Sequence, residues 1–241
     1  MKVVGIIPAR YASSRFHGKP LADIHGKPMV WWVYQQAKKV NIFDEVYVAT
    51  DDTLISTKVE ELGGKAILTS SMHLTGTDRV AEVSEKIHAD WYVNIQGDEP
   101  LIEPETIEAV LNPIKQGSND IHVINLMARI NDPVDAINPT IPKVITGEDG
   151  RGIYLTRGTS PYPKGSIDYF YYKQLGVYAF TPSALAFYKS SPRGKIERIE
   201  DIEILRFIEN GWHVKYIEVE TQSIAVDTPK DLEKVRNIFQ N

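Results

Sequence analysis

The sequence predicts an α/β fold in which a mostly parallel mixed sheet is covered by helices on both faces. The first half alternates short apolar runs rich in β-branched residues with longer amphipathic segments, the order that produces parallel strands joined by helices. From residue 121 onward, strand-like runs follow one another with little helix between them, which favours antiparallel pairing. At 241 residues the chain can bury one large core. We therefore expect a single domain, residues 1–241, in which residues 121–180 form a smaller antiparallel extension.

The elements of the first half follow from this alternation. The expected strands are Val3–Ile7, Glu45–Thr50, Lys65–Thr69 and Trp91–Ile95. The expected helices are Met29–Val40, Thr53–Leu62 and Asp78–Ile87, and another follows Pro104, whose fixed φ suits a first helical turn.

The second half contains more strand-like segments and one unusual loop. Its strand-like runs are Ile121–Ile130, Lys143–Ile145, Gly152–Leu155, Tyr171–Phe180 and His213–Val219. Helical periodicity returns at Pro182–Tyr188 and Ile199–Glu209, and a closing helix begins at Pro229. The segment Gly158–Tyr172 has two prolines, two glycines and five aromatic residues, which predicts an exposed loop that packs against a partner subunit.

Composition excludes several classes of function. The net charge of -5, from 32 acidic and 27 basic residues, argues against a general attraction to nucleic acid or to anionic membranes. The absence of cysteine excludes disulfides, thiolate chemistry and cysteine metal sites. The first apolar run is about six residues long, whereas spanning a bilayer takes roughly 20, so it is neither a membrane span nor a signal peptide. We expect a soluble, cytoplasmic protein.

A basic loop follows the first strand. Ligands of open α/β sheets bind beyond the carboxyl ends of the strands, and Arg10, Arg15 and Lys19 lie there among small and hydroxylated residues. Fixed positive charge together with backbone N–H groups is what a polyphosphate requires. A solvated basic loop explains the composition equally well.

Two acidic residues lie at strand ends. Asp98, in the run Gln96–Pro100, can hold Mg²⁺ against a phosphate, because this ion prefers one or two carboxylates with substrate oxygens and water. Taken alone, Asp98 is more simply a cap for the next helix. In Val226–Leu232, Thr228 and Pro229 are explained as a helix start, which leaves Asp227 as a second carboxylate for the metal.

A third motif, Thr75–Arg79, opens a helix with Thr77 or Asp78 as its expected N-cap. Arg79 in the first turn opposes the helix dipole, which indicates that it faces an anion or a base. A basic loop, two strand-end acids and a capped helix together favour metal-assisted phosphoryl chemistry over hydride transfer or triad hydrolysis.

At these same residues the chain resembles the 3-deoxy-manno-octulosonate cytidylyltransferases, or CMP-Kdo synthetases. The shared motifs run in order along nearly the whole chain: IPARYASSRFHGKPL, GKPM, VYVATDD, TGTDRVAE, VNIQGDEP, IYLTRGTSPYP, KQLGVYAF and VDTPKDLEKV. The resemblance implies a three-layer α/β/α sandwich of the nucleotide-diphospho-sugar transferase type with an antiparallel dimerisation extension. It also implies a homodimer and Mg²⁺ as the cofactor.

The resemblance also implies roles for individual residues. Lys19, Asp98 and Asp227 are the expected catalytic residues, and the two aspartates hold Mg²⁺. The residues expected to bind CTP are Pro8, Ala9, Arg10, Ser13, Arg15, Lys19, Thr75, Gly76, Arg79 and Gln96. Those expected to bind the acidic 3-deoxy-2-keto sugar are Arg157, Gln174, Tyr178, Glu203 and Ile204. The implied reaction transfers CMP from CTP to the anomeric 2-hydroxyl of the sugar and releases pyrophosphate, for lipopolysaccharide or capsule synthesis.

The chain departs from the family pattern at Thr156, Gln174 and Ile204, where serine, histidine and glutamine are usual, and His17 replaces a common proline. Because lost polar contacts alter discrimination between sugars, an amino or deoxy variant of Kdo is as consistent with the sequence as Kdo itself. A nonulosonic acid of the sialic type is a further alternative. A CTP-binding sensor without turnover is the alternative from another class.

Overall fold

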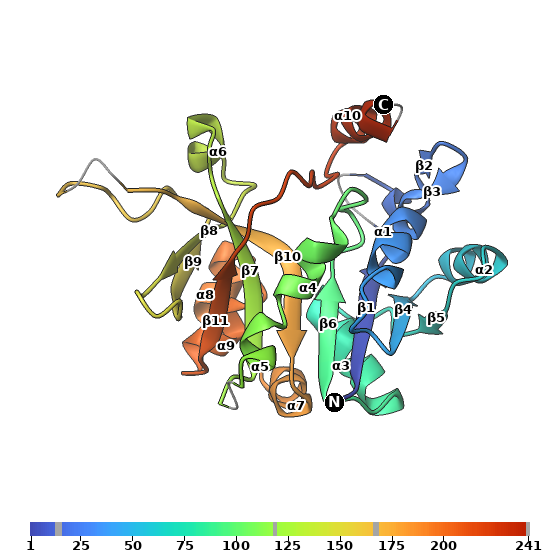
Figure 1. Cartoon of the computed structure of the whole chain (residues 1–241), viewed down its shortest axis with the longest axis horizontal. Helices are drawn as coiled ribbons and strands as arrows, with labels where there is room; N and C mark the ends of the chain where they lie inside the picture. The colour runs from blue at the N-terminus through green and yellow to red at the C-terminus, as the bar shows by residue number, and fades with distance from the viewer. Residues whose placement is uncertain (13–15, 118–119, 166–168, 240–241) are drawn as a thin grey trace.

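The computed structural model of the protein describes residues 1–12, 16–117, 120–165 and 169–239. Within these ranges a nine-stranded sheet runs through the centre, with helices on both of its faces (Figure 1). The strands are β1 (Val3–Ala9), β4 (Glu45–Thr50), β5 (Ala66–Leu68), β6 (Trp91–Ile95), β7 (Val123–Arg129), β8 (Lys143–Thr146), β9 (Gly152–Thr156), β10 (Tyr172–Phe180) and β11 (Val214–Glu218). Strands β2 (Asp23–Ile24) and β3 (Lys27–Pro28) form a separate two-stranded hairpin.

The helices form the outer two layers. They are α1 (Met29–Lys38), α2 (Thr53–Glu61), α3 (Gly76–Lys86), α4 (Pro104–Ala109), α5 (Asn112–Lys115), α6 (Pro133–Ile137), α7 (Pro182–Ser190), α8 (Lys195–Glu200), α9 (Leu205–Glu209) and α10 (Pro229–Phe239), with a 3₁₀ turn η1 (Lys19–Leu21). One apolar cluster joins α1, α2 and α4 to one face of the sheet, and a second joins α3, α7 and α9 to the other. The three-layer α/β/α prediction is therefore confirmed.

The sheet is mixed because it contains both parallel and antiparallel pairs of strands. Its strand order is β11-β7-β10-β6-β1-β4-β5, and β1 pairs in parallel with both β4 and β6. Strand β10 is antiparallel to both of its neighbours, β6 and β7. The antiparallel pairing predicted for residues 121–180 is present, but β7 and β10 belong to the central sheet. Only β8 and β9 branch from the main strand order of that sheet, since β8 pairs with the first residues of β10 and β9 pairs with β8.

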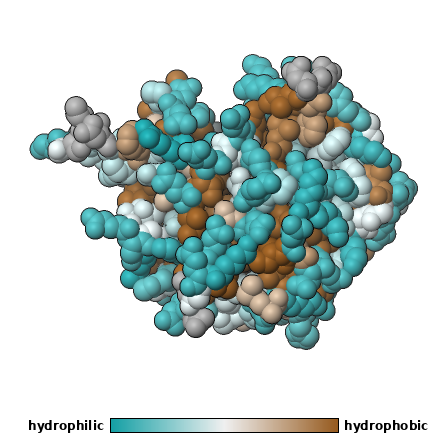
Figure 2. Space-filling view, viewed as in Figure 1, coloured by the Kyte–Doolittle hydropathy of each residue, from teal (hydrophilic) through white to brown (hydrophobic). Residues whose placement is uncertain are grey.

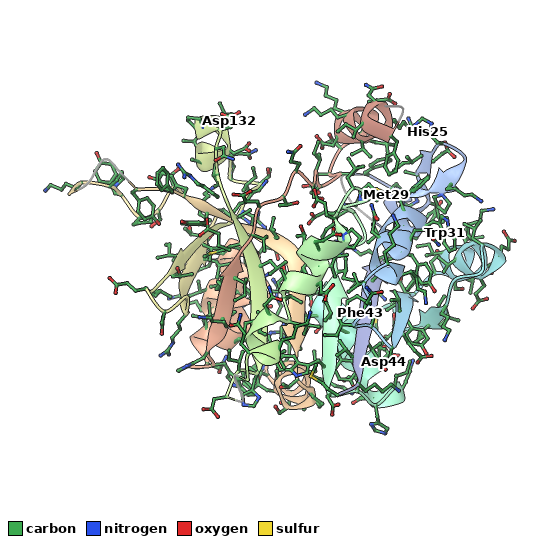
Figure 3. All side chains as sticks on the ribbon, viewed as in Figure 1. His25, Met29, Trp31, Phe43, Asp44 and Asp132 are labelled. Atoms are coloured by element: carbon green, nitrogen blue, oxygen red, sulfur yellow. The ribbon has the colours of Figure 1, made fainter. Side chains whose placement is uncertain are left out.

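Helices α6 and α7 begin where their local sequences favour a helix start, although only α7 was predicted. Pro133 and Pro182 stand in the first turns of α6 and α7, and the residues before them cap those helices. Asp132, labelled in Figure 3, accepts a hydrogen bond from the Val134 amide at 2.9 Å, and Thr181 caps α7 in the same way. Local sequence therefore sets these helix starts without help from distant residues.

The single helix predicted for Ile199–Glu209 is wrong. The structure has two short helices, α8 and α9, and Asp201 ends the first with a left-handed backbone at φ 51°. Ile202, Ile204 and Leu205 all enter the same apolar cluster, so the hydrophobic pattern continues across the break. Apolar spacing alone therefore could not reveal it. The short elements η1, β2, β3, α5 and α6 were also missed.

Most of the surface in Figure 2 is hydrophilic, and its outline is hollowed at the upper edge between α6 and α10. Among the described residues, no helix combines the length and the apolar character that a membrane crossing requires.

A buried ion pair joins α8 to α9. Arg206 donates from Nε and Nη2 to the two carboxylate oxygens of Glu197, each at 2.8 Å, and from Nη1 to the Tyr188 carbonyl oxygen at 2.9 Å. Both side chains are buried. A buried carboxylate that loses its bidentate partner keeps the cost of its desolvation.

We predict that Arg206→Met lowers the free energy of unfolding by about 3 kcal/mol, because Glu197 would remain buried with less compensation. The matched control is Lys189→Gln, which breaks the exposed pair of Lys189 with Glu85 and should cost less than about 1 kcal/mol. Urea denaturation measures both variants. Equal losses of unfolding free energy in the two variants would show that the buried pair stabilises the protein no more than the exposed pair does.

Candidate active site

A cavity of about 400 Å³ opens at the carboxyl ends of β1 and β6, where the sheet topology predicts ligand binding. Most of the predicted site residues line it: Pro8, Ala9, Arg10, Lys19, Thr75, Gly76, Arg79, Gln96, Asp98, Arg157, Gln174, Tyr178, Glu203 and Asp227. Met29, labelled in Figure 3 at the start of α1, also contributes to the wall. Ser13 and Arg15 lie outside the described residues.

Ile204 does not line the cavity, which corrects its assignment to the sugar site. It is 1% exposed and packs in the apolar core, because the break after α8 turns it inward. Thr156 is buried behind the wall, and its hydroxyl donates to Glu200 Oε1 at 2.8 Å. Of the three departures from the family pattern in the expected sugar pocket, only Gln174 therefore reaches the cavity.

The Lys19 ammonium group lies between the two predicted acids. Asp98 follows β6, but Asp227 lies in the irregular segment between β11 and α10, so its predicted place at a strand end is wrong. Lys19 Nζ donates to Asp98 Oδ2 at 2.6 Å and to the Val226 carbonyl oxygen at 3.0 Å, and it lies 3.7 Å from Asp227 Oδ1. Both carboxylates therefore face the same cavity. Asp98 does not cap the next helix, since α4 begins at Pro104 after Glu103, so the simpler explanation of Asp98 is wrong.

The residues around Lys19 fit a magnesium ion that shares its coordination with a substrate. Mg²⁺ prefers one or two carboxylates and completes its octahedron with water and phosphate oxygens. Asp98 and Asp227 supply two carboxylates within reach of one cation. In the described part of the chain no group of three or more His, Asp or Glu side chains could hold a metal alone. An ion bound by Asp98 and Asp227 would complete its coordination with water or with phosphate oxygens.

The segment that carries Asp227 is held across the strand ends by a buried glutamate. Glu99 accepts hydrogen bonds from the Gly176 amide at 3.3 Å and from Ser223 Oγ at 2.9 Å. The Val226 amide also donates to the Asp98 carbonyl oxygen at 2.8 Å. Burial raises the pKa of Glu99, and the neighbouring charge of Asp98 adds to the shift. Sequence reasoning missed this residue, although its place beside Asp98 was a signal.

The start of α3 forms another part of the wall. Thr75 is its N-cap and forms a capping box with Asp78, so the expectation of Thr77 or Asp78 as the cap is wrong. A Cβ atom on Gly76 would lie 3.3 Å from Gln96 Nε2 and 3.4 Å from Pro8. The absence of a side chain there lets the helix start approach β1 and β6 closely.

Arg79 is buried against the chain's own groups. Its guanidinium donates to Asp51 Oδ2 at 2.9 Å, to Thr69 Oγ1 at 2.8 Å and to the Ser70 carbonyl oxygen at 3.2 Å. The unfavourable position of Arg79 in the first turn of α3 is therefore offset by its ion pair with Asp51. Arg79 also lines the cavity, and its contact with the nucleotide stays a prediction.

At the other end of the cavity, β10 bulges between Gln174 and Tyr178. Asn125 Nδ2 donates to the carbonyl oxygens of Leu175 and Val177, at 2.9 and 2.8 Å, and Gln174 Nε2 donates to Asn125 Oδ1 at 2.8 Å. These hydrogen bonds of Asn125 hold the bulge, and Gln174 and Gly176 of the bulged segment line the cavity.

Two buried acidic groups complete this end. Glu203 accepts a hydrogen bond from the Thr77 amide at 3.1 Å, and burial raises its pKa above the ordinary value. Burial likewise raises the pKa of Tyr178 well above its ordinary value, and the charge of Glu203 adds to this. The Tyr178 hydroxyl is therefore protonated at neutral pH and can serve as a hydrogen-bond donor to a ligand.

Comparison with known proteins identifies the family. The sequence model of the cytidylyltransferases matches residues 4–223. The 3-deoxy-manno-octulosonate cytidylyltransferase of Geotalea uraniireducens is 42% identical, and the match covers 98% of each chain. That of Fusobacterium nucleatum is 41% identical over 100% of this chain and 98% of its own.

The chain belongs to the 3-deoxy-manno-octulosonate cytidylyltransferase family. A solved structure of CMP:2-keto-3-deoxy-manno-octonic acid synthetase complexed with CTP superposes with a TM-score of 0.94 at 40% identity, over 100% of this chain and 99% of that one. The inositol-1-phosphate CTP transferase of T. maritima, at 18% identity and a TM-score of 0.71, shares the fold alone. The predicted family and fold are therefore confirmed.

In this cytidylyltransferase, Glu82 holds the loop that carries two wall residues missed from the sequence, His73 and Leu74. Glu82 Oε2 accepts from the Ser70 amide at 2.8 Å and lies 2.5 Å from His73 Nε2, while Lys86 donates to Oε1 at 2.6 Å. Burial alone would raise the pKa of Glu82, but the hydrogen bonds from Lys86, Ser70 and His73 outweigh it and lower the pKa to about 2.

We predict that Glu82→Gln removes part of the acid sensitivity of the fold. A carboxylate whose pKa falls on folding contributes stability above its unfolded pKa, near 4.5, and loses that contribution as the pH falls toward about 2. The contribution amounts to up to about 3 kcal/mol. Urea unfolding at pH 5 and pH 3 should show a smaller loss in the variant than in the unmodified protein.

The control is Glu85→Gln on the same helix, where Glu85 is exposed and pairs only with Lys189 among the described residues. Its acid sensitivity should match that of the unmodified protein. If Glu82→Gln kept the full loss of stability between these pH values, Glu82 would not be the group responsible.

Proposed function

We propose that the chain transfers CMP from CTP to the anomeric 2-hydroxyl of Kdo, or of a closely related 3-deoxy-2-ulosonic acid, and releases pyrophosphate. The observation that carries this proposal is the Lys19 ammonium between the carboxylates of Asp98 and Asp227, in a cavity whose wall also includes Arg10. Membership of the family supports it, because the curated relatives carry that activity in their name.

In the proposed reaction the sugar hydroxyl oxygen forms a bond to the α-phosphorus and its proton passes to solvent. The bond from that phosphorus to the bridging oxygen breaks, and pyrophosphate leaves with the electron pair. Lys19 and Arg10 would offset the negative charge of the phosphates. Mg²⁺ bound by Asp98 and Asp227 would lower the pKa of the hydroxyl and stabilise charge on the phosphate. The reaction requires no nucleophile from the protein.

We predict that Asp98→Asn and Asp227→Asn each lower turnover by roughly three orders of magnitude or more, since each removes a charge that the phosphates and the metal require. Pyrophosphate release with CTP, Mg²⁺ and Kdo measures the rate, and circular dichroism tests the fold. Asp23→Asn, at an exposed position on β2 outside the cavity, is the control. A normal rate in either variant would remove that aspartate from the mechanism.

The same assay separates the alternative functions. Release with one ulosonic acid from a panel of Kdo, amino-Kdo and a sialic-type acid identifies the substrate. Normal CTP binding without release for any acid would instead support the CTP sensor, for which Asp227 is dispensable. Magnesium dependence is tested by chelation in the same reactions.

A divergent acceptor is favoured by one observation, the glutamine in the cavity wall. Gln174 Nε2 donates one hydrogen bond to Asn125, so its second N–H and its amide oxygen are the polar groups that this position can offer to a sugar. If the acceptor differs from Kdo, Gln174→His should raise kcat/KM for Kdo relative to the natural acid by about 10-fold.

The comparison variant is Ile204→Gln, which also restores a family residue but lies in the core. It should destabilise the protein and leave the choice of acid unchanged. Steady-state kinetics with two acids measures the preference of each variant between them. An unchanged preference in Gln174→His would favour ordinary Kdo as the acceptor.

We also propose a homodimer, formed through residues 157–165 and 169–171 between β9 and β10, which project from the sheet in Figure 1. Tyr162 on this segment is 85% exposed and Phe170 is 44% exposed, and the Arg129 guanidinium lies 3.1 Å from the centre of the Phe170 ring. Exposed aromatic and arginine side chains are enriched in protein interfaces. The cytoplasmic location and the pathway, lipopolysaccharide or capsule, stay predictions.

A further inference from the structure

An arginine that the sequence motifs did not indicate lines the acceptor end of the cavity. Arg193, between α7 and α8, is 26% exposed, and it contacts two acids of its own segment. Nε donates to Glu197 Oε1 at 3.1 Å and Nη2 donates to Asp201 Oδ1 at 2.8 Å. The side chain lies beside Arg157, because Arg157 Nη2 donates to the carbonyl oxygen of the same Asp201 at 3.1 Å.

Arg157 is a poor candidate for binding a carboxylate, since backbone oxygens occupy most of its donors. Nε donates to the Glu200 carbonyl oxygen at 2.6 Å, and Nη1 donates to those of Pro139 at 3.0 Å and Thr140 at 3.4 Å. With the bond to Asp201, these four contacts join Arg157 to two segments of chain, residues 139–140 and 200–201. These carbonyl groups belong to the backbone and cannot rotate away to admit a substrate.

Arg193 differs because its partners can be exchanged. The Asp201 side chain is 79% exposed and can turn into solvent. Glu197 would lose little, since Arg206 keeps it in two hydrogen bonds of 2.8 Å each. Exchange of the Asp201 carboxylate for a carboxylate of the substrate leaves the net charge around Arg193 unchanged, so the exchange needs no new counter-ion.

We propose that Arg193 binds the carboxylate of the acidic acceptor sugar, and that Asp201 occupies Arg193 until the sugar displaces it. This inference rests on the proposed function and adds to it the group that recognises the acid. It assigns Arg157 the role of a positioning residue. It also makes Asp201 an internal competitor of the substrate.

The two substitutions should have opposite effects. Arg193→Gln removes the cation and should raise the KM for the acceptor by about 10- to 100-fold, the range of a charge-assisted hydrogen bond. Asp201→Asn removes the competing charge and should lower that KM by about threefold. The KM for CTP should stay within about twofold in both, because neither residue is among those expected to bind CTP.

Both variants are expected to fold. Glu197 keeps Arg206 when Arg193 is replaced. Asn tolerates the left-handed backbone of residue 201, and the carbonyl oxygen that holds Arg157 is retained. The matched control is Arg198→Gln on α8, at an exposed position outside the cavity wall, which should change neither KM. Thermal unfolding of all three variants verifies that they are native.

The test is steady-state pyrophosphate release at saturating CTP with varied acceptor, for the unmodified protein and the three variants. Opposite shifts in the acceptor KM support the proposal, because a role in structure alone would make both substitutions weaken binding. An unchanged KM in Arg193→Gln, or shifts of both variants in the same direction, would overturn it while the proposed function stands. Failure of the unmodified protein to turn over any acid would overturn both.

Discussion

The cavity depends on one electrostatic constraint, which is that two carboxylates facing the same cavity need a cation between them. Lys19 meets this need through contacts to Asp98 and Asp227, residues that are distant in the chain. The parallel pairing of β1 with β6 brings the lysine loop and Asp98 to one edge of the sheet. The segment before α10 then returns Asp227 to the same place, so the site exists only when the whole fold is formed.

Irregular backbone builds the rest of the cavity. The bulge in β10, the left-handed residue between α8 and α9, and the segment that crosses the strand ends all interrupt regular hydrogen bonding. The first and the last are each stabilised by a buried polar side chain, because a backbone group without a partner is costly in the interior. Asn125 holds the bulge and Glu99 holds the crossing segment. These two side chains are therefore as much a part of the site as the residues that face the ligand.

The sequence predicted those features that depend on neighbouring residues, and it missed those that depend on contacts between distant parts of the chain. Strands β4 and β6 matched their predicted bounds because alternation and flanking residues are local properties. The break at Asp201 escaped prediction because apolar residues on both sides enter one core. Arg193 belongs to no motif, and only the tertiary structure brings it beside Arg157. Ile204 was assigned to the sugar pocket from a motif position, although the side chain there points into the core.

This distribution separates the proposed reaction centre from the residue proposed to influence the choice of acceptor. Lys19, Asp98 and Asp227 form one connected group of charges, and Gln174 belongs to another group, with Asn125 and the bulge. The described contacts link the two groups through Glu99, which accepts from the Gly176 amide on one side and from Ser223 on the other. Because Gly176 contributes its backbone to that link, a substitution at Gln174 can change the wall that faces the sugar without moving the acids. Divergence in the acceptor is therefore compatible with an unchanged reaction centre.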